Sequence, residues 1–238
     1  IRSTFSSIFS LLQEKWRDLS PSVQQELREM SLVPIGHTLV KPKRLFFRLA
    51  EDLSPFMHEV PRIFGSYEGV LKNLGVRESP DRKDYQGFLC ELRSETGVES
   101  LGPNELRAVL AIVESVCSGY ERESERLSER ERESERLGIS RREKERERET
   151  YVPDEKAVLR RATECLVCDD DWLREKTTNS IASLGLYFLH PSLCGEMRGV
   201  RERERELAGE SVVEVLRIPL LSQVVRETLV KRERERER

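Results

Sequence analysis

The stretch from Leu32 to Tyr67 decides the local fold and reads LVPIGHTLVKPKRLFFRLAEDLSPFMHEVPRIFGSY. Short apolar runs flank Gly36-His37, a turn candidate, and Pro34 restricts the first run to a sheet edge or a strand end. From Arg44 to Leu49 the apolar and basic residues alternate, which is typical of a strand with one buried face. The stretch therefore predicts a small β unit, and the face we expect to be buried carries Leu45, Phe47 and Leu49.

Helical patterns lie on both sides of this β unit. Residues 5–16 carry apolar side chains at helical spacing. Ser20-Pro21 combines an N-cap residue with proline at the first helical position, which marks a new helix. Ser79-Pro80 opens another helix, and Gly102-Pro103 opens a third. The apolar stripe of this third helix is the clearest in the chain, and it consists of Leu106, Val109, Leu110, Val113 and Val116.

The second half of the chain mixes both kinds of pattern. Residues 157–167 read as extended, and Trp172-Leu173 predicts a turn or a short helix. Ile181 to Leu189 is an apolar run that predicts a buried strand. Residues 212–229 return to helical spacing around Pro219. The whole pattern predicts a helix-rich α+β fold, with small β elements packed on helices.

Two blocks of this sequence carry a family pattern. The first block consists of Val33-Pro34, Leu39-Val40-Lys41-Pro42, Phe46-Phe47-Arg48-Leu49, Leu53-Ser54-Pro55-Phe56, Glu59-Val60-Pro61, Phe64-Gly65-Ser66 and Leu74-Gly75-Val76-Arg77. The second block is Val152-Pro153-Asp154-Glu155, Val158-Leu159-Arg160 and Asp170-Asp171-Trp172-Leu173. Together these blocks resemble the large sacsin-like proteins, especially their plant members.

The resemblance implies a place in a chaperone-type protein. That family carries ATPase modules like those of the ninety-kilodalton heat-shock chaperone and of histidine kinases, and its members are thought to act in protein quality control. The Gly-rich nucleotide-binding motifs of those modules are not found in these 238 residues. The resemblance therefore implies a non-catalytic scaffold or interaction segment outside the ATPase core. Its partners would be protein clients or neighbouring modules of a longer chain, and ATP would belong to modules not found here.

Runs of alternating Arg and Glu interrupt the chain. The heptapeptide ERESERL occurs at 121–127 and again at 131–137, and the alternation returns at 201–206 and 232–238. In strict alternation the i,i+3 neighbours attract while the i,i+4 neighbours repel, and almost no apolar side chain is present to bury. We therefore expect an exposed helix or disorder. A repeating GA dinucleotide encodes Arg-Glu alternation in every reading frame, so the runs are interpreted either as a gene-model artefact, such as a retained intron, or as charged spacer helices.

These patterns predict four parts of the chain. An α+β module spans residues 1–119, an Arg/Glu low-complexity insert spans 120–149, a second α+β module spans 150–230, and a charged tail spans 231–238. Because the sequence begins with Ile and not Met, we expect a fragment or a processed piece of a longer protein.

Composition argues against several partner classes. Lys and Arg number 41 against 44 Asp and Glu, and Glu neutralises Arg residue by residue, so no basic stripe forms and no nucleic-acid partner is expected. No apolar run approaches the roughly 20 residues that span a bilayer, so no membrane is expected. Five cysteines, an odd number, and no visible signal peptide indicate free thiols in a reducing compartment. We expect a cytoplasmic protein.

The sharpest candidate site is Cys165-x-x-Cys168 followed by His190-x-x-x-Cys194. Four such ligands can hold zinc in tetrahedral geometry, which would make the chain a small zinc-binding interaction module. Cysteine is also among the residues most often simply buried, and semi-buried free cysteines are the interpretation we favour. The sequence therefore predicts no metal site, with these four residues as the zinc candidates.

No catalytic signature is present in the sequence. Asp169-Asp170-Asp171 is not followed by the Gly and Glu of a calcium loop, and it predicts an acidic turn before Trp172. The chain has no G-x-S-x-G, H-E-x-x-H, P-loop or G-x-G-x-x-G motif. Catalytic triads assemble in space, so an enzyme with an unrecognised site stays open as an alternative around His37, His58 or His190. We predict that the chain is not an enzyme and carries neither catalytic nor cofactor-binding residues.

Overall fold

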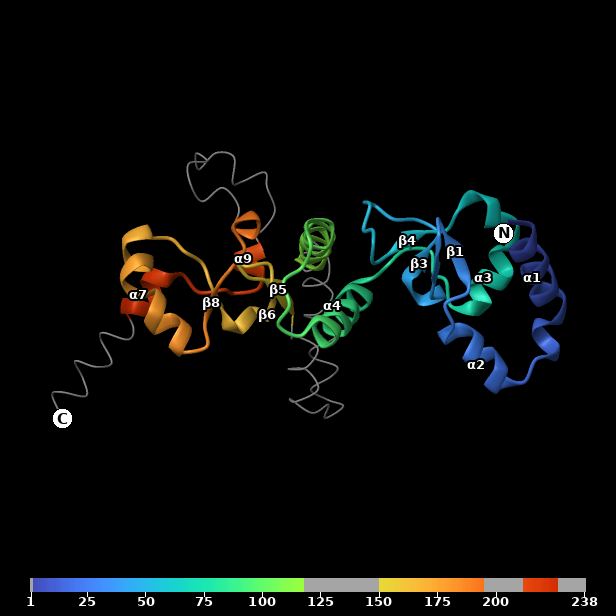
Figure 1. The fold of residues 1–238 in the computed structure, drawn as a ribbon, viewed down its shortest axis with the longest axis horizontal. Helices are drawn as coiled ribbons and strands as arrows, with labels where there is room; N and C mark the ends of the chain where they lie inside the picture. Colours follow the sequence, from blue (N-terminus) through green and yellow to red (C-terminus); the bar gives the residue numbers. More distant parts are fainter. Residues whose placement is uncertain (1, 118–149, 195–211, 227–238) are drawn as a thin grey trace, which may run out of the picture. The chain divides into compact units, whose positions relative to one another are not determined.

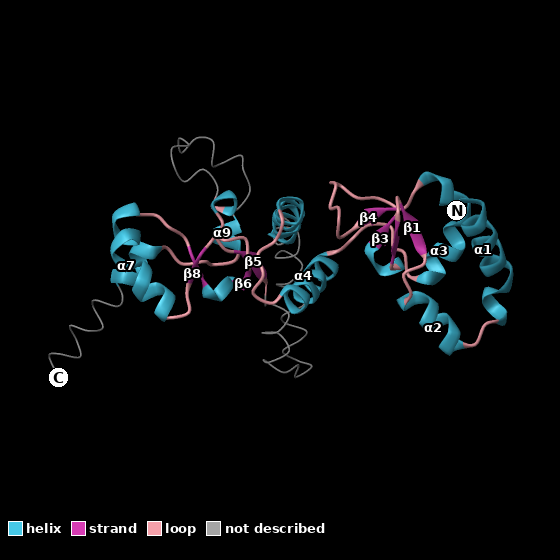
Figure 2. Cartoon of the chain, viewed as in Figure 1, coloured by secondary structure: helices cyan, strands magenta, loops and turns pink. Residues whose placement is uncertain are grey.

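The computed structural model describes residues 2–117, 150–194 and 212–226 (Figure 1). Helices predominate in these residues, and each sheet among them has two strands (Figure 2). The predicted helix-rich α+β fold is confirmed. The chain divides into two compact units, residues 1–81 and residues 82–238.

This division lies at Asp81, whereas the sequence predicted modules over residues 1–119 and 150–230. Helix α4 (Arg82–Thr96) belongs to the second unit, in which Gln86 Nε2 donates to Thr150 Oγ1 at 3.4 Å. The expected insert at 120–149 and tail at 231–238 lie outside the described residues. The four-part division of the chain therefore stays a prediction.

Two helices open the first unit. Helix α1 (Arg2–Lys15) places Phe9 in the core with no solvent exposure, and the 3-10 helix η1 (Trp16–Asp18) follows it. Helix α2 (Pro21–Glu29) begins as predicted. Ser20 Oγ accepts a hydrogen bond from the Val23 amide, and the backbone nitrogen of Pro21 carries no hydrogen that would need an acceptor in the first turn.

A hairpin of strands β1 (Val33–Ile35) and β2 (Thr38–Val40) follows the helices. The strands are antiparallel, with Pro34 opposite Leu39. Gly36 has a φ of 59° in the tight turn, a conformation that glycine adopts without steric cost. The predicted turn at Gly36-His37 is confirmed.

The next strand is shorter and more buried than its sequence predicted. The 3-10 helix η2 (Pro42–Arg44) leads into strand β3 (Leu45–Phe46), which pairs in parallel with β4 (His58–Glu59). On its other edge, the Phe47 amide donates to the Arg77 carbonyl at 3.0 Å. The expected alternation was wrong at Phe46, which is 1% exposed. Phe47 and Leu49, on the face expected to be buried, are only half-buried.

The first unit closes with the 3-10 helix η3 (Arg62–Tyr67) and helix α3 (Glu68–Leu74), which ends at Gly75 with a φ of 104°. Phe9 meets Phe64 edge to face, with 5.2 Å between the ring centroids. The core draws on both helical and β elements and consists of Phe9, Trp16, Val33, Leu45, Val60, Phe64, Val70, Leu71, Leu74 and Val76.

The second unit also begins with helices, α4 and a helix over residues 103–117. The link between them is bonded to the following hairpin, since the Leu101 amide donates to the Ala157 carbonyl at 2.9 Å and Ser100 Oγ donates to the Lys156 carbonyl at 2.7 Å. The predicted apolar stripe of the helix over residues 103–117 faces the core only in part, because Leu106 and Leu110 are half-buried. The fully buried residues of this helix are Ala108, Val109, Ile112, Val113 and Val116.

Four short strands follow in this unit. Strand β5 (Tyr151–Pro153) pairs antiparallel with β6 (Leu159–Arg161), and β7 (Cys165–Leu166) pairs in parallel with β8 (Tyr187–Phe188). The remaining elements are the 3-10 helices η4 (Ala162–Glu164) and η5 (Pro191–Leu193), helix α9 (Val212–Val215) and a helix over residues 221–226.

Helix α7 (Asp171–Ser183) corrects the prediction for Ile181 to Leu189. The expected strand is wrong over its first part, because Ile181 lies in the helix and only Tyr187 and Phe188 are in a strand. Gly185, with a φ of 70°, lies in the turn between helix and strand. The apolar run thus serves two elements that share one core cluster, which contains Leu166, Ile181, Phe188 and Leu221.

Candidate functional site

The thiol of Cys165 is enclosed in the core of the second unit. Its residue has no solvent exposure on β7, and burial raises its pKa to about 12. A zinc ligand must be a thiolate, and a thiolate is also the nucleophile in cysteine chemistry. Without a metal, Cys165 is therefore a thiol at neutral pH, which is not the nucleophilic form.

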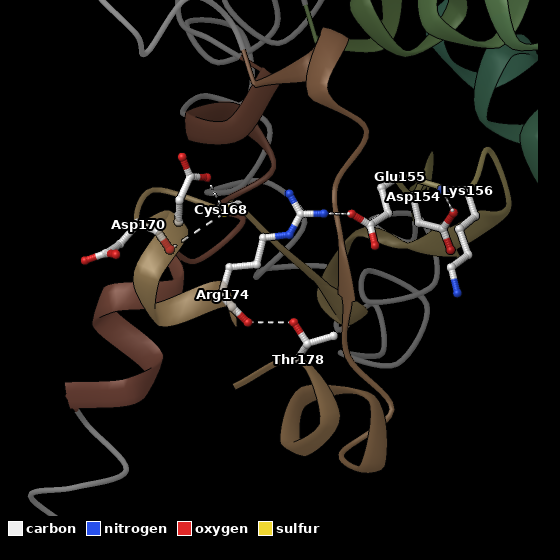
Figure 3. Close-up of polar contacts among 8 residues, drawn as sticks. Asp154, Glu155, Lys156, Cys168, Asp170, Arg174 and Thr178 are labelled. Carbon is white, nitrogen blue, oxygen red and sulfur yellow. Dashed lines mark hydrogen bonds and ion pairs between the residues drawn. The ribbon is translucent and has the colours of Figure 1, made fainter. Parts of the chain in front are cut away.

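The other three zinc candidates make local hydrogen bonds. Cys168 Sγ lies 3.9 Å from both the Asp170 carbonyl and Asp171 Oδ1. Figure 3 shows Cys168 beside Asp170. His190 caps η5, with its Nδ1 accepting from the Ser192 amide at 3.3 Å, and burial lowers its pKa. Cys194 Sγ donates to the His190 carbonyl at 3.7 Å, and burial, followed by the nearby Cys168, raises its pKa.

The described part of the chain holds no group of three or more His, Cys, Asp or Glu residues placed to bind a metal ion. The structure therefore does not group three of the four zinc candidates in one place, and the expected absence of a metal site stays a prediction.

The acidic run before Trp172 starts a helix. Asp170 Oδ1 accepts from the amides of Trp172 and Leu173 at 2.9 and 3.0 Å, so it is the N-cap of α7. Asp169 accepts from the Ser222 amide at 3.0 Å and also from the Ser222 hydroxyl. These carboxylates satisfy backbone donors and tie α7 to the chain near residue 222.

A buried ion pair lies in the β5–β6 hairpin of the second unit. Asp154 is 2% exposed, and its Oδ1 accepts from the amides of Lys156 and Val158 at 2.8 and 3.0 Å. Its Oδ2 accepts from Arg160 Nε at 3.1 Å. The Arg160 guanidinium also lies 3.7 Å from the ring centroid of Tyr187. The carboxylate thus closes the β5–β6 turn, and its partner Arg160 joins the hairpin to β8.

Arg174 makes a second connection to this hairpin. Its guanidinium pairs with Glu155 and lies 5.1 Å from the ring centroid of Phe188, so α7 is fastened to both β5–β6 and β8. Figure 3 shows Arg174 reaching from α7 to Glu155, beside Asp154. The charged groups of this cluster form two ion pairs, Asp154 with Arg160 and Glu155 with Arg174. Groups paired in this way form a structural network.

In the first unit, one histidine contacts a potential nucleophile. His58 Nε2 lies 3.0 Å from the Pro55 carbonyl, which can only accept, so Nε2 carries the proton and Nδ1 accepts from Ser54 Oγ at 3.4 Å. Burial lowers the pKa of His58. The serine–histidine distance exceeds the 2.6 to 3.2 Å that general-base catalysis uses. Ser54 and Pro55 lie in the segment that precedes β4, and His58 is the first residue of that strand. The third histidine, His37, lies in the exposed β1–β2 turn.

Sequence reasoning missed both of these polar clusters. The signal for the buried pair was Pro153-Asp154 at a turn, because an aspartate there bonds to amides two and four residues ahead. The signal for Ser54–His58 was only a spacing of four residues, which is uninformative outside a helix.

Among the described residues, no helix is both long enough and apolar enough to cross a membrane. No known family model and no solved structure matches the chain. A segment of 125 residues is 24% identical to Sacsin of Homo sapiens, and it covers 51% of this chain. The match covers 3% of that protein, so the chain corresponds to a small part of its relative. This similarity supports a sacsin-like relationship.

Proposed function

We propose that this chain is a non-catalytic scaffold and interaction segment of a sacsin-like, chaperone-type protein that takes part in protein quality control in the cytoplasm. The similarity to human Sacsin over 51% of the chain carries the proposal. The coverage of only 3% of that protein supports the view that the function belongs to a longer polypeptide.

The segment would lie outside the ATPase core, in a member of the plant type. Nucleotide would bind in other modules, since the Gly-rich motifs are not found in this sequence. The partners would be protein clients or neighbouring modules of the same polypeptide. Nucleic acid and membranes would not be partners. The near balance of 41 basic and 44 acidic residues supports the exclusion of nucleic acid.

The bonding of the polar side chains supports a non-catalytic role. The carboxylate of Asp154 and that of Asp170 are occupied by backbone amides, and the thiol of Cys165 is buried and protonated. Active sites instead hold side chains poised towards a substrate.

Client binding can be tested with the purified chain. Reduced insulin, whose B chain aggregates, is followed by light scattering with and without the chain, and with and without ATP. The proposal predicts that the chain slows aggregation near equal molar ratio, that ATP changes nothing, and that no ATP is hydrolysed. A variant without residues 121–148 controls for nonspecific solubilisation by the Arg-Glu runs. Aggregation unaffected by the chain would contradict the interaction role.

The enzymatic alternative has one specific test, at Ser54. A fluorophosphonate probe labels serines activated by a neighbouring base. The proposal predicts that the folded chain labels no faster than the denatured chain, and that Ser54→Ala changes nothing. Fast labelling that is lost in Ser54→Ala would show a catalytic dyad with His58 and would refute the non-catalytic role.

A further inference from the structure

The two units repeat one order of elements. Residues 33–77 run through β1, β2, η2, β3, β4, η3 and α3, and residues 152–219 run through β5, β6, η4, β7, β8, η5 and α9, with α7 added between β7 and β8. The pairing directions also agree. Both hairpins are antiparallel, and β3–β4 and β7–β8 are both parallel.

The hairpins match in register. Pro34 lies opposite Leu39 in the first, and Pro153 lies opposite Leu159 in the second. The residues before the two prolines, Val33 and Val152, both have no solvent exposure. Each turn contains one residue in the left-handed region, Gly36 with a φ of 59° and Ala157 with a φ of 58°.

The 3-10 helices after the hairpins match as well. Each begins three residues after the leucine just named, η2 at Pro42 and η4 at Ala162. Their N-caps have nearly the same backbone, with φ −69° and ψ 139° at Lys41 and φ −66° and ψ 139° at Arg161. Each then leads directly into the strand that forms the parallel pair.

The parallel pairs continue with the same hydrogen bond. The Val60 amide donates to the Phe46 carbonyl at 2.9 Å, and the Leu189 amide donates to the Leu166 carbonyl at 2.9 Å. The next residue caps a 3-10 helix in both units. Its φ and ψ are −57° and 135° at Pro61, and −57° and 132° at His190.

Both units close in the same way. The amide of Val76 donates to the carbonyl of Leu71 at 3.0 Å, and the amide of Ile218 donates to the carbonyl of Val213 at 3.0 Å. The residue before each donor has a positive φ, 104° at Gly75 and 53° at Arg217. The chain then returns to the first strand of the parallel pair. The Phe47 amide donates to the Arg77 carbonyl at 3.0 Å, and the Val167 amide donates to the Pro219 carbonyl at 3.0 Å.

The largest difference in length lies at an Arg-Glu run. Phe64 and Leu193 are equivalent buried residues of the 3-10 helices, and Leu71 and Val213 are equivalent carbonyl acceptors. Gly65 therefore corresponds to Cys194, and Val70 corresponds to Val212. Between these positions the first unit has four residues, Ser66 to Gly69. The second unit has residues 195–211 there, which include the run at 201–206.

We propose that residues 33–77 and 152–219 are two copies of one structural unit, and that residues 195–211 are an insertion that the second copy does not need in order to fold. The inference rests on backbone pairings of the described residues and is independent of the proposed function. It makes the chain a tandem array in which the second copy carries an added charged segment at one connection.

The test transplants the connection of the first copy. In the full chain, residues 195–211 are replaced by Ser-Tyr-Glu-Gly, the residues at 66–69. The proposal predicts an unfolding temperature within about 3 °C of the parent and retained hydrogen-exchange protection at the amides of Leu189 and Ile218. The size-matched control deletes Asp171–Ser183, which also removes a net 13 residues but takes Ile181 from the core. It should lose this protection.

A second variant with an eight-residue Gly-Ser bridge separates the two parts of the proposal. If the Ser-Tyr-Glu-Gly variant unfolds while the longer bridge folds, the segment is dispensable but the two copies are not equivalent, and the claim of two copies is overturned. If both variants lose protection at Leu189, residues 195–211 are part of the fold, and the claim of an insertion is overturned.

Discussion

The buried carboxylate of Asp154 offers the sharpest test of what holds the second unit together. Asp154→Asn keeps an oxygen for the amides of Lys156 and Val158 but turns an NH₂ group towards Arg160 Nε, so two donors face each other. Breaking a buried ion pair costs about 3 to 5 kcal/mol. Arg160 keeps its contact with the Tyr187 ring, so we expect the lower value, about 3 kcal/mol.

The assay is urea unfolding combined with hydrogen exchange read by mass spectrometry. A loss of about 3 kcal/mol corresponds to a fall of roughly 6 to 12 °C in the unfolding temperature. Peptides of residues 150–194 should lose protection, while peptides of residues 1–81 act as an internal reference. The matched control is Glu155→Gln, the next carboxylate along the chain, whose pair with Arg174 is partly exposed and should contribute less than about 1 kcal/mol.

A double-mutant cycle with Arg160→Met isolates the pair. We expect a coupling free energy of about 2 kcal/mol between Asp154 and Arg160. A loss below about 1 kcal/mol in Asp154→Asn, or equal loss of protection in both units, would refute the reasoning.

Three further predictions concern single residues. Gly75→Ala should cost about 1 kcal/mol and Arg217→Gly should gain about 0.5 kcal/mol in urea unfolding, because both positions have a positive φ; equal signs would contradict this. Burial lowers the pKa of His58 below 6.5, so the unfolded chain takes up the proton first, and the stability that His58 contributes is complete above pH 6.5 and declines as the pH falls. The parent should therefore lose more stability than His58→Gln between pH 7.5 and 5.5, and equal losses would show that His58 is not responsible. Burial raises the pKa of Cys117 and of Cys165 to about 12, so a thiol-disulfide reagent at pH 8 should label exposed Cys90 well before either, as peptide mapping would show.

Local signals in the sequence predicted the element boundaries well where one residue determines the backbone. Ser20-Pro21 begins a helix because the side chain accepts from a backbone amide, and Gly36-His37 makes the turn because glycine tolerates a positive φ. Both effects act within a few residues, so a pattern can predict them.

Features that depend on distant partners could not be predicted in this way. Strand β3 pairs with β4 on one edge and with Arg77 on the other, and Phe46 is 1% exposed, none of which the alternation of Arg44 to Leu49 reveals. The Arg160–Asp154 pair joins two strands of a hairpin whose turn was not predicted. The likeness of the two units could not be predicted from the sequence, because it lies in the hydrogen-bond register. The shared sequence signal is Val-Pro, at 33–34 and at 152–153.

Sequencing full-length transcripts across the gene would test the proposal that the chain is a segment of a much larger sacsin-like protein. The proposal predicts a reading frame that continues into Gly-rich ATPase modules and from which the Arg-Glu runs are spliced out. A transcript that encodes only these 238 residues, with the Arg-Glu runs intact, would contradict it.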